Sequence, residues 1–160
     1  MNVTFAPRGI LQIDEARIIF RNFAGIGSKF NREGDRNFAV IIPSEDIANR
    51  MREEGWNVKI KAPREEGDTP FMYLPVKVKF NERGPQIYLK TGSTVNKLNE
   101  NTISCLDKLD ILSVDMDIRP YDWEMSDGKT GRSAYLQSMQ VIQEIDRFAA
   151  RSASEEFPGE

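Results

Sequence analysis

The chain has 160 residues, a formal net charge of −3, one cysteine and no histidine. A single cysteine cannot form an internal disulfide, and without histidine the usual zinc ligand sets and the commonest general base are missing. The composition therefore argues against zinc sites and against hydrolases that use a histidine base, although a carboxylate-based enzyme stays compatible with it. We expect no cofactor and no bound metal.

The length predicts a single domain, residues 1–150, followed by a short acidic tail, residues 151–160, that we expect to be flexible. The sequence contains no run of 18 apolar residues, and its first ten residues, MNVTFAPRGI, lack the apolar stretch of a signal peptide. These features predict a protein of a reducing cytoplasm.

The charge is distributed unevenly along the chain. Residues 17–36 carry five cations and two acids, and residues 56–97 carry eight cations and four acids. Residues 99–128, in contrast, carry two cations and eight acids. A local basic surface, rather than the total charge, determines whether a protein attracts phosphate, so nucleic-acid binding is compatible with the negative total.

The first elements in chain order form a predicted β-hairpin around a basic loop. Apolar residues alternate from Leu11 to about Phe23 and again over residues 38–42, whereas residues 1–8 show little pattern. Between the two strands lies a segment rich in glycine and cations. Rings that stack on bases, interleaved with cations that follow phosphates, are typical of single-stranded nucleic-acid binding. The alternative is an ordinary hairpin with core phenylalanines and solvated arginines.

The aromatic and cationic side chains of this part of the chain divide into two groups. Those in phase with aliphatic residues are expected in the core: Phe20, Phe38 and Phe80. Those expected on the ligand side are Arg21, Phe23, Lys29, Phe30, Arg32 and Arg36.

A short surface helix is predicted after the hairpin. Ser44 is a favourable N-cap, Glu45 and Asp46 complement the helix dipole in the first turn, and Gly55 ends the helix. A polar loop, residues 62–70, follows the next strand.

Three strands then alternate between an apolar and a basic side, over residues 56–61, 76–80 and 87–90. Trp56, Val58 and Ile60 are expected on the apolar side of the first strand. The side chains expected opposite the core are Lys59, Lys61, Lys77, Lys79, Tyr88 and Lys90. We interpret them as nucleic-acid contacts; the alternative is an antiparallel sheet with one solvated face.

The remaining chain is predicted to hold a loop over residues 92–101, a short helix over 102–109 and two strands. The first strand covers residues 111–118 and carries Tyr121 and Trp123 on a common face if it continues. The last strand covers 133–145 and shifts its alternation near Gln137 and Ser138, which predicts a β-bulge. Two large rings flanked by acids favour a partly solvated location, so Tyr121 and Trp123 are also candidate DNA contacts.

Two other patterns suggest different chemistry. Gly128-Lys129-Thr130 resembles the end of a phosphate-binding loop, but the position of the required earlier glycine is occupied by Trp123, which favours a simple turn. Five aspartates follow closely in sequence and could together hold Mg²⁺ as nuclease carboxylates do: Asp107, Asp110, Asp115, Asp117 and Asp122. A solvated acidic face is the favoured interpretation of these aspartates.

Several stretches together resemble a group of small single-stranded-DNA-binding proteins of bacteriophages and prophages. They are Phe20 to Gly25, Asn31 to Gly34, Arg36 to Pro43, Gly55 to Lys59 and Gly131 to Leu136. The resemblance covers most of residues 9–146. It implies a mainly β fold, an oligonucleotide/oligosaccharide-binding (OB) barrel. Because the first helix follows the second visible strand and not the third, we expect an elaborated barrel with an inserted surface helix.

The resemblance also implies a function. We expect a non-catalytic protein that coats single-stranded DNA during phage or prophage replication or recombination in the bacterial cytoplasm, with weak sequence preference. Replication or recombination proteins are possible partners of the acidic tail, although the chain ends in Gly159-Glu160 and not in the apolar residue usual for such tails. The alternatives are a carboxylate- and Mg²⁺-dependent nuclease and a protein-binding or virion β-domain.

Overall fold

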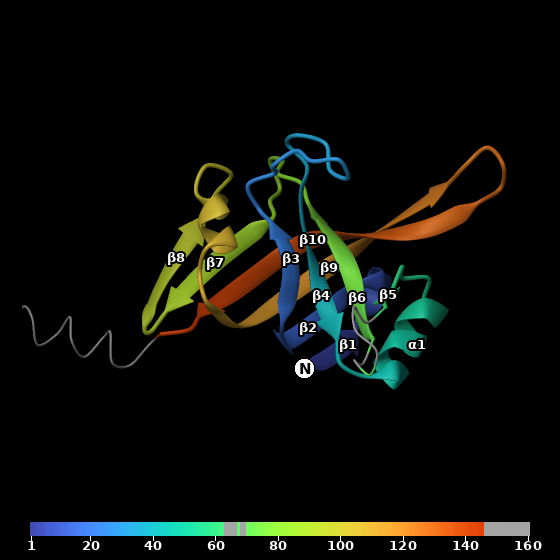
Figure 1. Ribbon diagram of the computed structural model, residues 1–160, viewed down its shortest axis with the longest axis horizontal. Coiled ribbons are helices and arrows are strands. Elements are labelled where there is room, and N and C mark those ends of the chain that lie inside the picture. The colour runs from blue at the N-terminus through green and yellow to red at the C-terminus, as the bar shows by residue number, and fades with distance from the viewer. Residues whose placement is uncertain (63–66, 68–69, 146–160) are drawn as a thin grey trace, which may run out of the picture.

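The computed structural model describes residues 1–62, 67 and 70–145. In this part of the chain ten strands form one sheet, accompanied by one α-helix and two short 3₁₀ helices (Figure 1). The strands are β1 (Asn2–Phe5), β2 (Leu11–Ala16), β3 (Ile18–Asn22), β4 (Arg36–Ile42), β5 (Lys59–Lys61), β6 (Phe71–Val78), β7 (Gln86–Thr91), β8 (Thr94–Leu98), β9 (Ile111–Glu124) and β10 (Thr130–Gln143). The helices are α1 (Glu45–Glu53), η1 (Pro7–Gly9) and η2 (Ile103–Asp107).

The main path of the sheet runs β1-β2-β9-β10-β6-β4-β3, with β5 beside β6 and the β7–β8 hairpin beside β10. The pairs are antiparallel except that β10 runs parallel to β6 and to β7. The predicted mainly β, OB-like fold with an inserted helix is confirmed. The barrel is open, however, because the hydrogen-bonded path ends at β1 and β3 and does not close on itself.

The opening follows from a break in the first predicted strand. We expected one strand from Leu11 to about Phe23, but the chain forms β2 and β3, which pair with different neighbours, β9 and β4. Glu15 and Phe20 have φ values of 54° and 55°, a left-handed conformation that interrupts both ladders. Each bend redirects the strand, so consecutive segments join opposite ends of the sheet.

The core fills the inner face of this curved sheet. Inward positions alternate as the period of a strand requires, and their side chains are nearly inaccessible to solvent. Examples are Phe38, Val40, Leu74, Val76, Val114, Met116, Leu136 and Val141. On β10 the register shifts between Leu136 and Ser138, so the bulge predicted there is confirmed.

Helix α1 is confirmed as a capped surface helix. The Ser44 hydroxyl accepts a hydrogen bond from the Ile47 N–H at 3.2 Å, and Gly55 follows the helix with a φ of 95°. Ala48 and Met51 are its buried side chains, and they pack into the core. The helix lies between β4 and β5, earlier in the chain than the helix of the plain five-stranded OB barrel.

Several predicted boundaries were wrong. Residues 2–5 pair with β2, and residues 94–98 pair with β7, although we predicted irregular structure for both. Strand β6 begins at Phe71 and not at Val76, because its aromatic N-terminal half lacks a simple alternation of apolar and polar residues. Ile60 is 59% exposed, whereas Trp56 and Val58 are buried as predicted, because only residues 59–61 form a strand. The predicted loop at 62–70 lies largely outside the described residues, and the tail lies entirely outside them.

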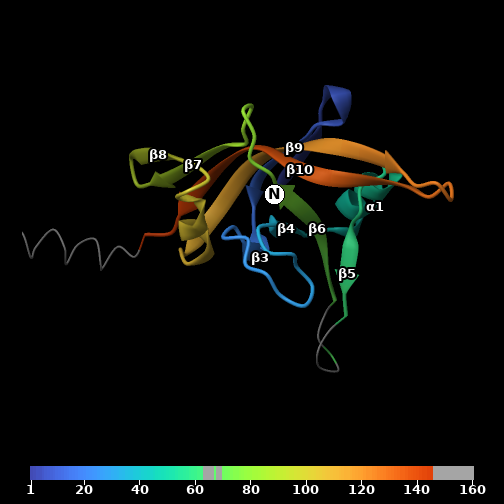
Figure 2. The same cartoon turned by 90° about the horizontal axis from the view of Figure 1, so that it is seen from above.

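Two hairpins extend from opposite sides of the sheet (Figures 1 and 2). The β7–β8 hairpin lies beside the C-terminal half of β10. On the other side, the N-terminal part of β10 and the C-terminal part of β9 continue past the body as a two-stranded arm. We call residues 120–134 the arm.

Candidate nucleic-acid interface

A groove of about 690 Å³ crosses the outer face of β4 and β6. Its floor is formed by Asn37 and Ala39 of β4 and by Pro75 and Lys77 of β6, which face each other in the register of the two strands. Side chains from β3, β5, β10 and the loop of residues 23–35 form its sides: Phe20, Lys59, Tyr135, Phe30 and Arg32. The short side chains of Ala39 and Pro75 between larger walls make this surface concave.

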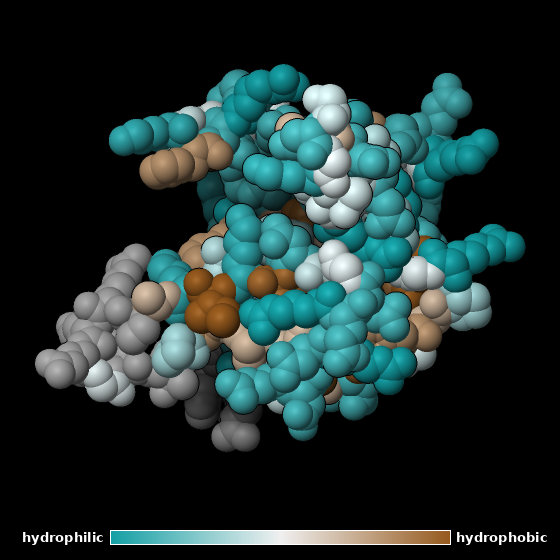
Figure 3. All heavy atoms as spheres, turned by 90° about the vertical axis from the view of Figure 1, so that its right-hand side faces the viewer, coloured by the Kyte–Doolittle hydropathy of each residue, from teal (hydrophilic) through white to brown (hydrophobic). Residues whose placement is uncertain are grey.

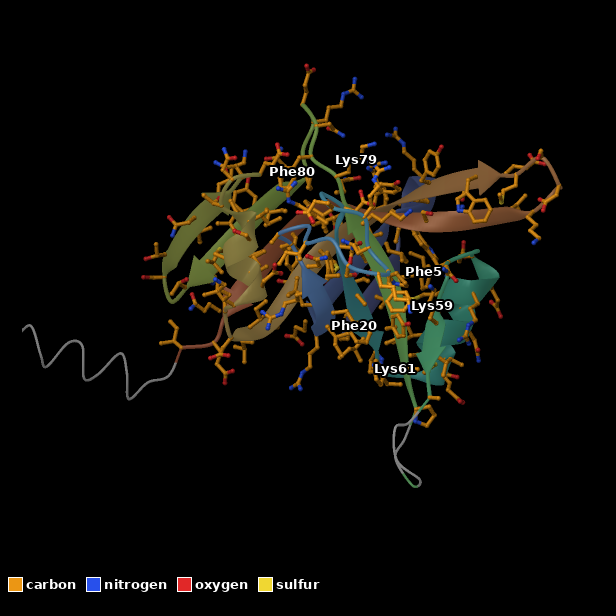
Figure 4. The ribbon with its side chains drawn as sticks, turned by 45° about the horizontal axis from the view of Figure 1, so that its top comes forward. Phe5, Phe20, Lys59, Lys61, Lys79 and Phe80 are labelled. Carbon is orange, nitrogen blue, oxygen red and sulfur yellow. The ribbon has the colours of Figure 1, made fainter. Side chains whose placement is uncertain are left out.

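The first wall is an aromatic cluster with two lysines. Phe20 packs edge-on against Tyr73 with ring centroids 5.4 Å apart, and Phe71 lies 6.3 Å from Phe20. The Lys61 ammonium lies 4.8 Å from the Phe20 ring centroid, and Lys59 is paired with Tyr73 across β5 and β6. Figure 4 shows Phe20, Lys59 and Lys61 gathered beside β5 and β6.

Our expectation that Phe20 belongs to the core was wrong. Its left-handed backbone turns the side chain outward, and the ring is 44% exposed. Phe23 shows the complementary error, because we expected it on the ligand side. Its side chain is fully buried and stacks on Phe38 with centroids 5.2 Å apart. The irregular backbone at Phe20 thus places Phe20 on the outer face and Phe23 in the core, the reverse of what we expected.

The second wall is centred on Tyr135 of β10, which sequence reasoning missed. Lys77 and Arg119 lie 5.7 Å and 4.9 Å from its ring centroid, and Tyr121 packs edge-on at 5.9 Å. The alternation of Tyr135 with the buried Ala134 and Leu136 could have identified it as an outward residue. Cations beside ring faces are favourable at exposed sites, and single-strand binding surfaces combine both kinds of side chain.

The loop of residues 23–35 holds Phe30 over the groove. The Phe30 side chain is 92% exposed, so it is not a core residue, and its loop is fixed by internal hydrogen bonds. The Asn31 side-chain amide donates to the carbonyls of Ile26 and Asp35 at 2.9 and 3.0 Å. Its Oδ1 accepts a hydrogen bond from the amide of Asn37, on the groove floor, at 2.9 Å. The loop is therefore held in place by hydrogen bonds within the protein.

The predicted cations do not all face the groove freely. Lys29 and Arg32 lie on the exposed loop, and Lys79 lines the groove near Phe80, at the far end of β6 from Lys61 (Figure 4). The Arg21 guanidinium instead donates to the carbonyls of Leu106 and Leu109 at 2.7 and 2.6 Å. It ties β3 to the segment around η2, so Arg21 is engaged within the protein and does not line the groove.

Arg36 lines the groove but is already engaged within the protein. Its Nε donates to the Phe23 carbonyl at 2.9 Å, and its Nη1 lies 3.4 Å from the Glu100 carboxylate. The guanidinium also lies 5.5 Å from the Phe80 ring centroid. Phe80 packs against the core as expected. The contact between the Arg36 guanidinium and the Phe80 ring therefore links Arg36 to the core.

Comparison with known proteins connects this geometry to a family. The family described as "Putative phage ssDNA-binding domain" matches residues 2–158. The chain belongs to this family. No curated protein matches the chain. The phage domain binds single-stranded DNA, in agreement with the function expected from the sequence.

Two solved structures have a similar fold. The single-stranded DNA-binding protein from bacteriophage Enc34, in a C-terminal truncation, has 16% identity and a TM-score of 0.56, covering 91% of this chain and 91% of that chain. A second structure of the Enc34 protein has 16% identity and a TM-score of 0.55, covering 92% of this chain and 88% of that one. OB folds bind oligonucleotides on the face of their second and third strands and on the preceding loop. In this phage domain the groove occupies that position.

Tyr88 and Lys90 lie elsewhere in this phage ssDNA-binding domain. They belong to β7, and Tyr88 lines a separate hollow of about 260 Å³ beside Asp14, Asp115 and Asp117. The structure therefore does not bring these two residues to the groove. The carboxylates beside Tyr88 also repel phosphate. The alternation of the sequence grouped them with the groove lysines, because alternation does not tell which strands pair with one another. Strand β7 pairs with β10 and β8 and not with β6.

Tyr121 and Trp123 lie on the arm and are 54% and 38% exposed. Trp123 is opposite Gly131, next to the pair formed by Asp122 and Arg132. Arg132 Nε and Nη2 donate to the two Asp122 oxygens at 2.7 and 3.2 Å. These hydrogen bonds lower the pKa of the Asp122 carboxyl and raise the pKa of the Arg132 guanidinium.

Three of the five aspartates considered as nuclease ligands have separate structural partners. Asp107 accepts hydrogen bonds from the backbone N–H groups of Phe23 and Ala24, at 2.8 and 2.9 Å. Asp115 accepts one from the Glu15 N–H at 2.8 Å, and Asp122 is paired with Arg132. In the described part of the chain no group of three or more acidic, cysteine or histidine side chains is arranged to hold a metal ion. Within the same residues no helix has the length and apolar character needed to span a bilayer.

Proposed function

We propose that this phage domain coats transient single-stranded DNA during replication or recombination in the host cytoplasm, without catalysing a reaction. The observation that carries the proposal is the groove, where aromatic rings alternate with lysines on an ordered, concave surface. Such surfaces bind single strands with little sequence preference, because every base has a π-face and every nucleotide a phosphate.

In this proposal the two kinds of side chain have different roles. Bases stack on Phe20, Tyr73, Tyr135 and the overhanging Phe30, which border the groove. Phosphates are contacted by the cations along its length and on the loop: Lys29, Arg32, Lys59, Lys61, Lys77 and Lys79. Stacking on these rings is possible for every base, which fits a coating role.

Binding to single strands should be tighter than binding to duplex and should weaken steeply with salt. Fluorescence anisotropy with a labelled oligonucleotide at several salt concentrations measures both properties. Each phosphate contact contributes about 0.7 to the slope of log affinity against log salt for single strands, because condensed counterions are released. Lys77→Ala should therefore reduce the slope by about 0.7.

Lys97→Ala is the matched control, because Lys97 is exposed on β8, away from the groove. It should leave the slope unchanged. Equal affinity for duplex and single strand, or an affinity independent of salt, would contradict the proposal. Labelled DNA should also remain intact when incubated with the protein and Mg²⁺; cleavage that is lost in Asp115→Asn would instead support the nuclease.

The acidic tail adds a second element to the proposal. Residues 151–160 lie outside the described residues, so their role is argued from their charge alone. Acidic tails can recruit replication or recombination proteins, and we propose this for the present chain. Retention of such a protein by the full chain, but not by a chain lacking residues 152–160, is the test.

A further inference from the structure

The arm borders a hollow that is separate from the groove. This hollow has a volume of about 510 Å³ and lies between the arm and the segment that follows α1. Its lining includes Trp56, Asn57 and Lys59 on one side and Trp123, Gly131 and Arg132 on the arm. Lys59, Pro75 and Lys77 line both the groove and this hollow, so the two adjoin. Figure 3, which faces the arm end of the molecule, shows a hollow in a largely hydrophilic surface.

Trp123 is placed in this hollow by a glycine. A Cβ atom at Gly131 would lie 2.6 Å from the Trp123 Cε2 atom, closer than two carbon atoms can approach. The glycine therefore allows the indole ring to lie directly against the backbone of β10. The Trp123 side chain stays 38% exposed, whereas Trp56, across the hollow, is 3% exposed. Trp123 is thus a supported ring with an accessible surface, as a base-stacking platform requires.

Positive charge gathers where this hollow adjoins the groove. Arg132 is held between the Trp56 ring, 5.3 Å from its centroid, and the Asp122 carboxylate. Its Nη1 takes no part in the pair with Asp122, and Lys59 and Lys77 add positive charge to the same hollow. Glu54, Asp122 and Glu124 line an adjoining hollow of about 500 Å³, and Trp123 and Arg132 line both hollows. Of the two hollows, the one with Lys59 and Lys77 in its lining is the one that a phosphate backbone can approach.

The strand register gives the distance between Trp123 and the groove. Lys77 is opposite Tyr135, and Tyr135 is opposite Arg119, so these residues mark one row across the sheet. Trp123 lies four positions beyond Arg119 on β9, which corresponds to about 13 Å at about 3.3 Å per residue. At the rise of one strand in duplex DNA, about 3.4 Å per nucleotide, this distance corresponds to about four nucleotides.

We propose that this hollow is a second nucleobase subsite, in which a base stacks on Trp123 only when the DNA strand extends past the groove. This inference rests on the proposed function of the groove. The groove binds short strands by itself, and the arm adds stacking and phosphate contacts for longer ones. Affinity then rises in a step with length, in addition to the gradual rise expected from charge alone.

Tryptophan fluorescence tests the inference directly, because Trp123 is exposed and Trp56 is buried. Oligothymidylates of about 4 to about 16 nucleotides, the range of site sizes per OB fold, are titrated while binding is followed independently by anisotropy. The shortest strands should bind without quenching the fluorescence. Strands longer by about four nucleotides should quench it, and Trp123→Phe should abolish the quenching.

Variants separate the arm from the groove. Trp123→Ala should weaken binding of long strands by about 5- to 150-fold, the range for loss of one stack, and leave short strands unaffected. Gly131→Ala should displace the ring and have the same selective effect. Tyr88→Ala is the matched control and should change neither. If Gly131→Ala fails to fold, Trp123→Ala provides the same comparison.

Three outcomes would overturn the inference, and they can be told apart. Quenching by the shortest strands would place Trp123 in the groove site itself. Binding of long strands without quenching would show that DNA does not reach the arm. Absence of binding by anisotropy at every length would remove the groove's proposed function, and the arm subsite with it.

Discussion

Phe20 decides the character of the groove at the scale of single residues. Its positive φ turns the ring out of the core and onto Tyr73, beside Lys61. A bulky residue in this conformation is strained, and such strain persists where the surrounding structure over-determines it. The same irregularity lets Phe23 enter the core against Phe38. The distribution of rings between core and groove thus depends on one backbone angle.

Phe23 and Phe30 should respond oppositely to substitution by alanine. Phe23→Ala removes a fully buried ring and should lower the free energy of unfolding by about 3–5 kcal/mol. Phe30→Ala removes a side chain that is 92% exposed, so stability should hardly change, while DNA binding should weaken by about 1–3 kcal/mol. Urea unfolding and anisotropy measure the two effects. Unaltered binding by Phe30→Ala would show that the loop does not stack on DNA.

Asn31 should act as a positioning residue for Phe30. Asn31→Ala removes the amide that links Ile26, Asp35 and Asn37, so the loop should lose order and DNA affinity should fall severalfold. The loss should be much smaller in a Phe30→Ala background, since coupled residues are not additive. Asn96→Ala, on the exposed strand β8, is the control. Additive losses in the double variant would contradict this role.

At the scale of elements, each part of the chain either builds the sheet or presents the groove. Helix α1 belongs to the first group, because Ala48 and Met51 pack into the core and residues 45–53 do not line the groove. The loop of residues 23–35 belongs to the group that presents the groove. Asp107 anchors the start of this loop by accepting hydrogen bonds from two backbone N–H groups. Asp107, one of the acids after residue 99, therefore supports the interface by holding this loop.

Ser44→Ala tests this division. The substitution removes the N-cap hydrogen bond to Ile47 and should lower the free energy of unfolding by about 1 kcal/mol. DNA affinity should stay the same at temperatures where the variant is folded. Ser44→Asp, which retains a capping oxygen, should recover the stability. A reduced affinity in folded Ser44→Ala would show that the helix influences the groove.

At the scale of the whole molecule, the separated charges of the sequence correspond to separated surfaces. Lysines of β5 and β6 line the groove, whereas Asp115 and Asp117 line a hollow of their own with Tyr88. A negative total charge is therefore compatible with a cationic binding surface. The acidic residues of the tail, Glu155, Glu156 and Glu160, are further negative charges in the sequence.

Removal of residues 152–160 should tighten DNA binding modestly at low salt and leave the melting temperature nearly unchanged. Glu155, Glu156 and Glu160 repel phosphate and compete for the basic groove, an effect that salt screens. A full-length variant with these three glutamates changed to glutamine should behave like the deletion. Loss of binding or unfolding on deletion would instead make the tail a structural part of the domain.

Local patterns in the sequence determined much of this fold. The capped helix, the strands around Phe38, Val76 and Ile87 and the bulge near Gln137 all follow from alternation, capping and turn chemistry. These signals act between residues close in sequence, which is why they can be read without the structure. The basic character of the loop and of the lysine-bearing strands was likewise visible in composition.

Tertiary structure alone decided which of these residues meet. The β2–β3 break, the separation of Tyr88 from Lys77 and the presence of Tyr135 and Arg119 in the groove wall depend on which strands pair. Pairing is set by contacts between distant segments, and one left-handed residue reverses every side chain that follows in a strand. The sequence therefore determined the kind of surface this protein carries, and the pairing of distant strands determined which side chains form it.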